Sequence, residues 1–175
     1  MRIDVLFGIA GLGPGDFSGR VVAVIDVLRA STCIAVALGN GARAIIPLES
    51  SEEVVTRAKA FERSEVRLAG ERKMLPIPGF DLGNSPLEFT PEAIEGKTVL
   101  MSTTNGTGAV TGSQGARDVV IASYVNLSAV VSMLRAALRG GADVAIMCAG
   151  REKQFGLEQM DLAKRTAAIC RIEQE

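Results

Sequence analysis

Residues 98–108 read TVLMSTTNGTG: an apolar run over Thr98–Ser102 passes directly into a loop of small hydroxyl, amide and glycine residues. The apolar run predicts a buried β-strand, and the Thr103–Gly108 loop predicts a turn into a helix. A strand–loop–helix transition gathers backbone N–H groups at one point, where they can bind an anionic oxygen such as that of a phosphate. The alternative is an ordinary turn, because Asn-Gly pairs are common in turns. A segment of similar composition, Gly79–Pro86, lies upstream.

Similar apolar runs recur along the chain and alternate with helical periodicity. We predict strands at Ile3–Phe7, Val21–Asp26, Ala44–Leu48, Val66–Ala69, Thr98–Ser102, Val119–Ser123 and Val144–Cys148. We predict helices at Ser31–Asn40, Ser51–Arg63 and Leu127–Arg139, and a charged helix over Met160–Glu175. Several strands are apolar at consecutive positions, which indicates that both of their faces are covered. The alternation predicts an α/β layered sandwich with a largely parallel sheet.

The composition narrows the class of protein. A chain of 175 residues favours a single domain over residues 1–175. No apolar run is long enough to span a bilayer, and the N-terminus has no signal-peptide pattern, so we expect a soluble, cytoplasmic protein without a membrane partner. The net charge of −1, with 19 basic and 20 acidic residues interspersed, and the absence of tryptophan argue against a nucleic-acid partner.

The reactive side chains exclude several mechanisms. The chain has no histidine, which rules out a Ser-His-Asp triad, a Cys-His dyad and a histidine-ligated zinc. The three cysteines, Cys33, Cys148 and Cys170, form no CxxC pair and indicate neither a zinc site nor a disulfide framework. Acid–base chemistry must therefore come from carboxylates, a tuned Lys, Tyr or Cys, or a metal-bound water.

Polar residues follow the predicted strands at their carboxyl ends, where open α/β sheets bind ligands. Asp26 ends an apolar strand and can ligate Mg²⁺ or attack phosphorus, although it can also pair with Arg29 or cap a helix. Arg29 can clamp a phosphate or a sulfonate. Glu71 and Arg72 follow another strand and can serve the same site or neutralise each other.

Further candidates lie in the loops. Asp81 and Asn84 can orient a substrate or a metal, or can act as turn formers that lock the loop. Arg151 follows the last predicted strand, and Glu158 at the start of the final helix can supply a second carboxylate to a metal. Cys148 also ends a strand, but a phosphocysteine signature requires an arginine where this chain has Gln154, so Cys148 is interpreted as a small buried residue.

Five segments resemble the 2-phosphosulfolactate phosphatase family, in family order. They are Ile25–Thr32, Gly70–Arg72, Gly79–Pro86, Ser102–Thr107, and Cys148–Arg151 together with Phe155–Glu158. The resemblance implies a three-layer α/β/α sandwich with a parallel or mixed central sheet, and Mg²⁺-dependent hydrolysis of 2-phospho-3-sulfolactate to 3-sulfolactate and phosphate. In methanogens this step belongs to coenzyme M biosynthesis. The chain departs from the family at Gln159, where the family has an acidic residue, and is truncated or divergent after about Glu158.

We therefore expect a Mg²⁺-dependent phosphatase acting on a small anionic phosphorylated hydroxy acid. The expected catalytic residues are Asp26, Arg29 and Glu71, and the expected metal ligands are Asp26 and Glu158. The expected substrate-binding residues are Arg72, Asp81, Asn84, Thr103, Thr104, Asn105, Gly106 and Arg151. A homodimer is plausible for a fold with uncovered apolar helix faces.

Two alternatives stay open at this point. One is a non-catalytic protein that keeps the fold and only binds an anion or a partner. The other is an isochorismatase-like cysteine hydrolase with Cys148 as nucleophile and Asp26 as base.

Overall fold

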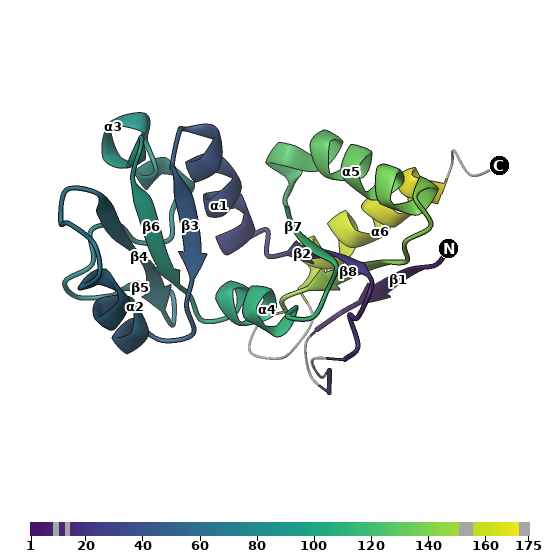
Figure 1. Cartoon of the computed structure of the whole chain (residues 1–175), viewed down its shortest axis with the longest axis horizontal. Coiled ribbons are helices and arrows are strands. Elements are labelled where there is room, and N and C mark those ends of the chain that lie inside the picture. Colours follow the sequence, from purple (N-terminus) through teal and green to yellow (C-terminus); the bar gives the residue numbers. More distant parts are fainter. Residues whose placement is uncertain (9–10, 13–14, 151–155, 172–175) are drawn as a thin grey trace.

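The computed structural model describes residues 1–8, 11–12, 15–150 and 156–171 (Figure 1). Its strands are β1 (Ile3–Leu6), β2 (Val21–Ile25), β3 (Ala44–Pro47), β4 (Val66–Arg72), β5 (Leu75–Pro76), β6 (Thr98–Ser102), β7 (Asp118–Ala122) and β8 (Val144–Cys148). Its α-helices are α1 (Ala30–Gly39), α2 (Ser51–Ala58), α3 (Pro91–Ile94), α4 (Gly106–Gly112), α5 (Leu127–Arg139) and α6 (Leu157–Arg171), with 3₁₀ turns at η1 (Pro86–Glu88) and η2 (Tyr124–Asn126). Every predicted strand is present, and the helices predicted from Ser31, Ser51 and Leu127 are confirmed as α1, α2 and α5.

The strands form two four-stranded sheets, ordered β1-β8-β2-β7 and β3-β6-β4-β5. All pairs are parallel except β4 with β5, so the predicted α/β class is confirmed. The strands are divided between two sheets rather than placed in one, because alternation of strand and helix does not specify which strands pair. Figure 1 shows the β3-β6-β4-β5 sheet on the left and the β1-β8-β2-β7 sheet on the right.

The chain passes between the two sheets at the carboxyl ends of two strands. It leaves β2 through the turn at Asp26 and runs along α1 to β3 in the other sheet. It returns from β6 through the Thr103–Asn105 loop and α4 to β7. Both connections between the sheets therefore begin with residues that the sequence analysis names as candidate functional residues.

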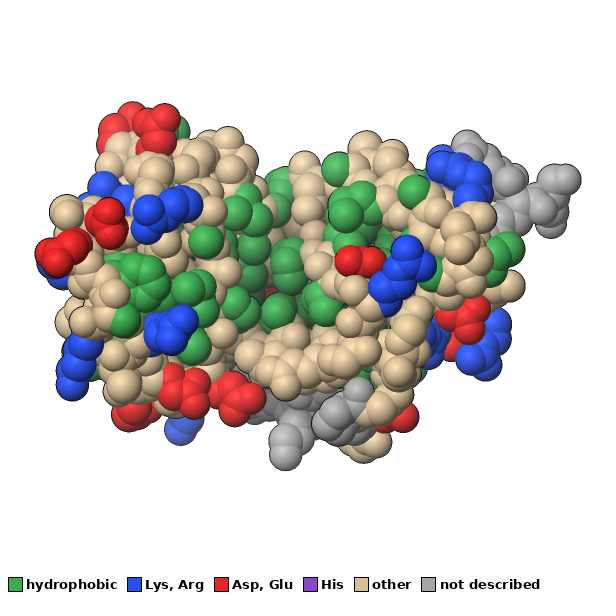
Figure 2. All heavy atoms as spheres, in the orientation of Figure 1, with side chains coloured by type: hydrophobic (Ala, Val, Ile, Leu, Met, Phe, Trp, Pro, Cys, Tyr) green, Lys and Arg blue, Asp and Glu red, His purple; other side chains and the backbone are tan. Residues whose placement is uncertain are grey.

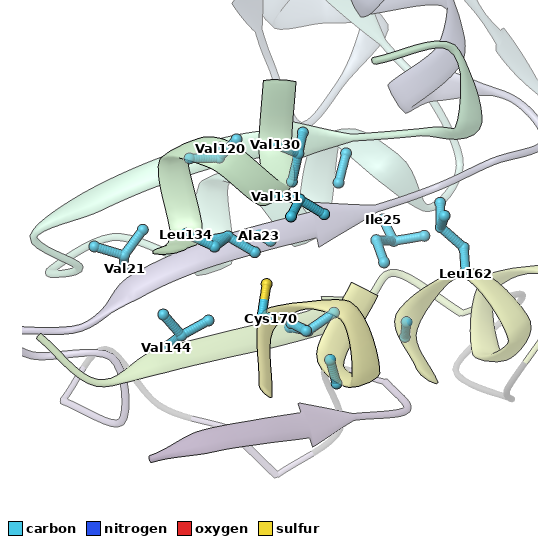
Figure 3. Close-up of a cluster of buried hydrophobic side chains, with 14 of the residues drawn as sticks. Val21, Ala23, Ile25, Val120, Val130, Val131, Leu134, Val144, Leu162 and Cys170 are labelled. Atoms are coloured by element: carbon cyan, nitrogen blue, oxygen red, sulfur yellow. The ribbon is translucent and has the colours of Figure 1, made fainter. Parts of the chain in front are cut away.

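Strand β2 is buried on both of its faces, as its unbroken apolar sequence predicts. Val21, Ala23 and Ile25 face one core, which α5 and α6 cover (Figure 3). Val22 and Val24 face the opposite core, where they pack with Phe17, Ala109, Ala145, Met147 and Ala149. The position of Asp26 is thus fixed by a strand that is held from two sides.

The second sheet is also covered on both faces. One core contains Val99 and Met101 of β6 together with residues of α1 and with Ile94 of α3. The other contains Leu100 of β6 and Val54 of α2. None of the helices in the described part of the chain combines the length and apolar character needed to cross a membrane.

Strand β4 approaches β6 most closely at Gly70. A Cβ atom at this position would lie 1.9 Å from the backbone carbonyl oxygen of Ser102, and the φ angle is +147°. Only glycine satisfies both conditions. Contrary to our expectation, β4 does not end at Ala69 but continues to Arg72, because Glu71 and Arg72 pair antiparallel with β5.

We predict that Leu134→Ala on α5 lowers the free energy of unfolding by about 2–5 kcal/mol, because the side chain is fully buried and its removal leaves a cavity. The neighbouring Met133 is 55 % exposed, and Met133→Ala should cost about 0.5 kcal/mol or less. Urea denaturation of both variants measures the difference. Equal costs would contradict the packing of α5 described above.

Candidate active site

The two sheets meet at a pocket of about 660 Å³. It is lined by six segments: the turn between β2 and α1, the hairpin between β4 and β5, the loop after β5, the loop after β6, the residues after β8, and the start of α6. Its polar lining residues are Asp26, Arg29, Glu71, Lys73, Asn84, Thr104, Asn105, Glu158 and Gln159. Figure 2 shows apolar side chains in the hollow between the two lobes of the molecule. Residues far apart in the sequence thus converge where both passages between the sheets begin.

Asp26 is buried at the wall of this pocket. Its backbone N–H donates to Ser31 Oγ (2.9 Å), and its carboxylate accepts backbone N–H groups of Ala30 and Arg29 at the start of α1. Burial, and to a lesser extent the nearby charges of Glu71 and Glu158, raise the pKa of Asp26 from 3.8 to about 6. The hydrogen bonds from α1 lower the pKa and only partly offset this.

Glu71 is also buried, but its carboxylate is fully hydrogen-bonded. Oε1 accepts the backbone N–H of Thr104 (2.7 Å), while Oε2 accepts the Thr104 hydroxyl (3.0 Å) and the backbone N–H of Met74 (2.7 Å). Glu71 therefore ties the loop after β6 to the β4–β5 hairpin. These contacts support a positioning role, whereas the catalytic role expected for Glu71 stays a prediction.

The loop after β6 differs from the phosphate cradle that its sequence predicts. The N–H of Thr103 donates to Thr107 Oγ1 (3.1 Å), and the N–H of Thr107 donates to Thr103 Oγ1 (3.2 Å). The N–H of Thr104 donates to Glu71. The expectation that the Thr103 and Thr104 amides are available to a phosphate is thus wrong, because protein acceptors already use both.

Gly106 lies directly against the carboxylate of Asp26. A Cβ atom at Gly106 would be 2.5 Å from Asp26 Oδ2 and 2.4 Å from the Cβ atom of Ala30. The start of α4 can approach Asp26 this closely only because residue 106 has no side chain. The loop after β6 and the turn after β2 therefore lie on the same rim.

Asn84 has an unsatisfied amide. The residue is 94 % buried and lines the pocket, and its Oδ1 atom has no hydrogen-bond partner among the described residues. A buried polar atom without a partner is rare in folded proteins and indicates a ligand or water at that point. The structure therefore favours a ligand contact for Asn84 over a turn-forming role.

Four of the predicted substrate-binding residues in the described part of the chain lie outside the pocket lining: Thr103 and Gly106 of the loop after β6, and Asp81 and Arg72. The carboxylate of Asp81 pairs with Arg63 and accepts the backbone N–H of Leu68 (2.8 Å), so Asp81 attaches its loop to β4. The guanidinium of Arg72 donates to Ser102 Oγ (2.7 Å) and to the carbonyl oxygens of Glu49 and Glu71. Both side chains thus hold the second sheet together. Arg151 lies outside the described residues.

The start of α6 brings two further side chains to the pocket. Glu158 is in the first turn of α6. Gln159 is buried, and its Oε1 accepts the N–H of Gly150 (2.9 Å) while its Nε2 donates to the carbonyl of Gly150 (3.5 Å). A carboxylate at position 159 could not donate the second bond, which gives a structural reason for the departure at Gln159.

Cys148 ends β8 but is buried, and it is not among the residues lining the pocket. Burial and the nearby Glu158 charge raise the pKa of its thiol to about 12. A thiol with so high a pKa is a poor nucleophile at neutral pH. The structure therefore argues against the cysteine-hydrolase alternative.

The oxygen-rich lining is suited to Mg²⁺ in its chemistry. Within the described residues, no three Asp, Glu, Cys or His side chains come close enough together to form a metal site by themselves. Mg²⁺ commonly uses only one or two carboxylates and completes its shell with water and substrate phosphate. Asp26 and Glu158 as a pair, with the amide oxygen of Asn84 in the same pocket, fit that mode.

Comparisons with known proteins identify the family of the chain. The family model described as 2-phosphosulpholactate phosphatase matches residues 11–174. A probable 2-phosphosulfolactate phosphatase of Clostridium botulinum (strain Alaska E43) is 39 % identical over 158 residues, which are 90 % of this chain and 65 % of that protein. Proteins of the same description from Symbiobacterium thermophilum and Caldanaerobacter subterraneus are 47 % and 42 % identical, covering 82 % and 83 % of this chain. The chain spans only 60 % and 59 % of the length of these two relatives.

We predict that Asp26→Asn stabilises the metal-free protein at high pH. The folded-state pKa of about 6 lies above the ordinary value of 3.8, so the wild type loses stability as the pH rises through this window. The variant carries no such charge and should gain about 1–3 kcal/mol over the wild type at pH 8, with a smaller difference at pH 4. Urea denaturation of the variant and the wild type in EDTA, at pH 8 and at pH 4, measures both stability differences. The exposed Asp118→Asn is the control. A stability difference that does not depend on pH would contradict the raised pKa of Asp26.

We also predict that Gly106→Ala destabilises the fold by about 1–3 kcal/mol, because the added methyl group must displace Asp26 or Ala30. Gly108, two residues along α4, has no atom within 4 Å of its Cβ position. Gly108→Ala should therefore be neutral or stabilising by up to about 1 kcal/mol. Thermal unfolding compares the two variants. A Gly106→Ala variant as stable as the wild type would contradict the close approach of residue 106 to Asp26 and Ala30.

Proposed function

The chain belongs to the 2-phosphosulfolactate phosphatase family, and we propose that it hydrolyses 2-phospho-3-sulfolactate, or a similar small phosphorylated hydroxy acid, in a Mg²⁺-dependent reaction. The products would be the free hydroxy acid and phosphate. The names of the relatives support the phosphatase class. Mg²⁺ dependence and the choice of substrate are our proposals.

The observation that carries the proposal is the buried carboxylate of Asp26 among other carboxylates. Desolvation and the charges of Glu71 and Glu158 all oppose ionisation of Asp26. A cation bound beside Asp26 would reverse this balance, because an opposite charge favours the ionised form. Perturbed carboxylates at a pocket are typical of functional sites.

In this proposal Asp26 and Glu158 hold Mg²⁺, in agreement with the oxygen chemistry of the pocket. When bound, Mg²⁺ supplies Lewis-acid polarisation of the phosphoryl oxygens. Asp26 is oriented by α1 and by Ser31, so its carboxylate is fixed before substrate binds. This pre-organisation is the main contribution that a protein makes to phosphoryl transfer.

The remaining lining residues would neutralise and orient the substrate. Arg29 borders the pocket next to Asp26 and can neutralise the phosphoryl oxygens as charge develops on them. Asn84 offers an unsatisfied amide oxygen to the cation or to a water that the cation binds. Thr104 and Asn105 form the opposite wall, which Glu71 holds in place.

We predict that the purified chain releases phosphate from 2-phospho-3-sulfolactate with Mg²⁺ and loses this activity in EDTA. Asp26→Asn and Glu158→Gln should each reduce kcat/KM by about 100-fold or more, since each removes a charge that would hold the cation. Exposed Asp118→Asn serves as a matched control and should retain full activity. A colorimetric phosphate assay measures the rates.

Full activity of Asp26→Asn, or activity that persists in EDTA, would overturn this proposal. A well-folded wild type that binds phosphate but releases none from a panel of phosphorylated hydroxy acids would instead favour the anion-binding alternative.

A further inference from the structure

The turn between β4 and β5 has an unusual backbone. It consists of Lys73 and Met74, and both have positive φ angles, 50° and 68°. Two-residue hairpin turns with this geometry strongly favour asparagine and glycine, because other side chains are strained there. A lysine and a methionine at these positions are therefore an exception to the usual turn chemistry, and such exceptions cluster at functional sites.

Hydrogen bonds attach this turn to the wall of the pocket. The N–H of Lys73 donates to Thr104 Oγ1 (3.1 Å), and the N–H of Met74 donates to Glu71 Oε2 (2.7 Å). Glu71 also accepts the N–H of Thr104 (2.7 Å). The turn and the loop after β6 are thus joined through one buried carboxylate, and Lys73 lines the pocket from this position.

The charges of the lining are distributed unevenly between the two sides of the pocket. Asp26 and Glu158 come from the β1-β8-β2-β7 side, together with Arg29. On the other side both oxygens of Glu71 already accept hydrogen bonds from the protein, which leaves Lys73 as the cationic side chain of that wall that can meet an anionic ligand. No ion pair of the Lys73 ammonium exists within residues 1–8, 11–12, 15–150 and 156–171.

We propose that Lys73 binds the carboxylate of the substrate, while the phosphoryl group lies on the Asp26 side. This assignment rests on the proposed phosphatase function and names the residue that selects for a doubly anionic substrate. A single positive charge at a rigid turn recognises a second anion by charge and by its distance from the phosphoryl group.

The test compares 2-phospholactate with its methyl ester, which lacks the free carboxylate. Lys73→Gly should raise KM for the free acid by about 5- to 20-fold, leave kcat within about twofold, and leave KM for the ester unchanged. Lys73→Arg should restore most of the affinity. Lys59→Ala, which removes an exposed lysine at the end of α2, is the control and should match the wild type.

Lys73→Gly also separates binding from folding. Glycine accepts a positive φ without strain, so the melting temperature of this variant should equal or exceed that of the wild type. A raised KM in a protein of undiminished stability would support a direct contact with the substrate.

Equal effects of Lys73→Gly on the acid and the ester, or no effect on either, would overturn the assignment while leaving the phosphatase proposal intact. If the wild type releases phosphate neither from these two compounds nor from 2-phospho-3-sulfolactate, the phosphatase proposal fails. The role of Lys73 is then decided by calorimetry with the same two compounds, and equal affinity of the wild type for both would overturn it.

Discussion

A buried negative charge at the carboxyl end of β2 is the constraint on which the site depends. Asp26 follows a strand that is buried on both faces, and it precedes a helix that begins four residues later. Two N–H groups at the start of α1 and the approach of Gly106 fix the carboxylate in position. The same carboxylate is destabilised by burial and by two neighbouring carboxylates. Stability alone would not select such a residue, whereas binding of a cation would.

Glu71 shows how a second carboxylate in the same pocket can have a different role. Its two oxygens accept three hydrogen bonds, so its charge is satisfied within the protein. It joins the two segments of the second sheet that face Asp26, namely the β4–β5 hairpin and the loop after β6. The environment therefore distinguishes Asp26, whose ionised form is opposed by burial and by neighbouring charges, from Glu71, which holds the wall in place.

Local sequence predicted the elements well and their arrangement only in part. The unbroken β-branched runs of β2 and β8 and the one-sided apolar stripe of α5 are strong local signals, and these elements lie where they were expected. Assignment of strands to two sheets depends on pairing between distant segments, which no local pattern records. Strand β5 escaped prediction because Lys73 and Met74 are not the residues that mark a two-residue turn.

Site residues that directly follow a strand could be predicted from the sequence. The hydrogen-bond and ion-pair partners of individual side chains could not. Asp26, Arg29, Asn84, Thr104 and Asn105 all line the pocket as expected. Arg72 and Asp81 have the right chemistry, but partners within the second sheet use their side chains. Lys73 was missed because its place at the pocket comes from the hairpin geometry.

The most direct test of the central claim is a crystal structure of the chain with Mn²⁺ in place of Mg²⁺ and with phosphate. The account predicts an anomalous peak bonded to Asp26 and Glu158 with phosphate beside it, and a peak bonded to neither carboxylate would contradict it.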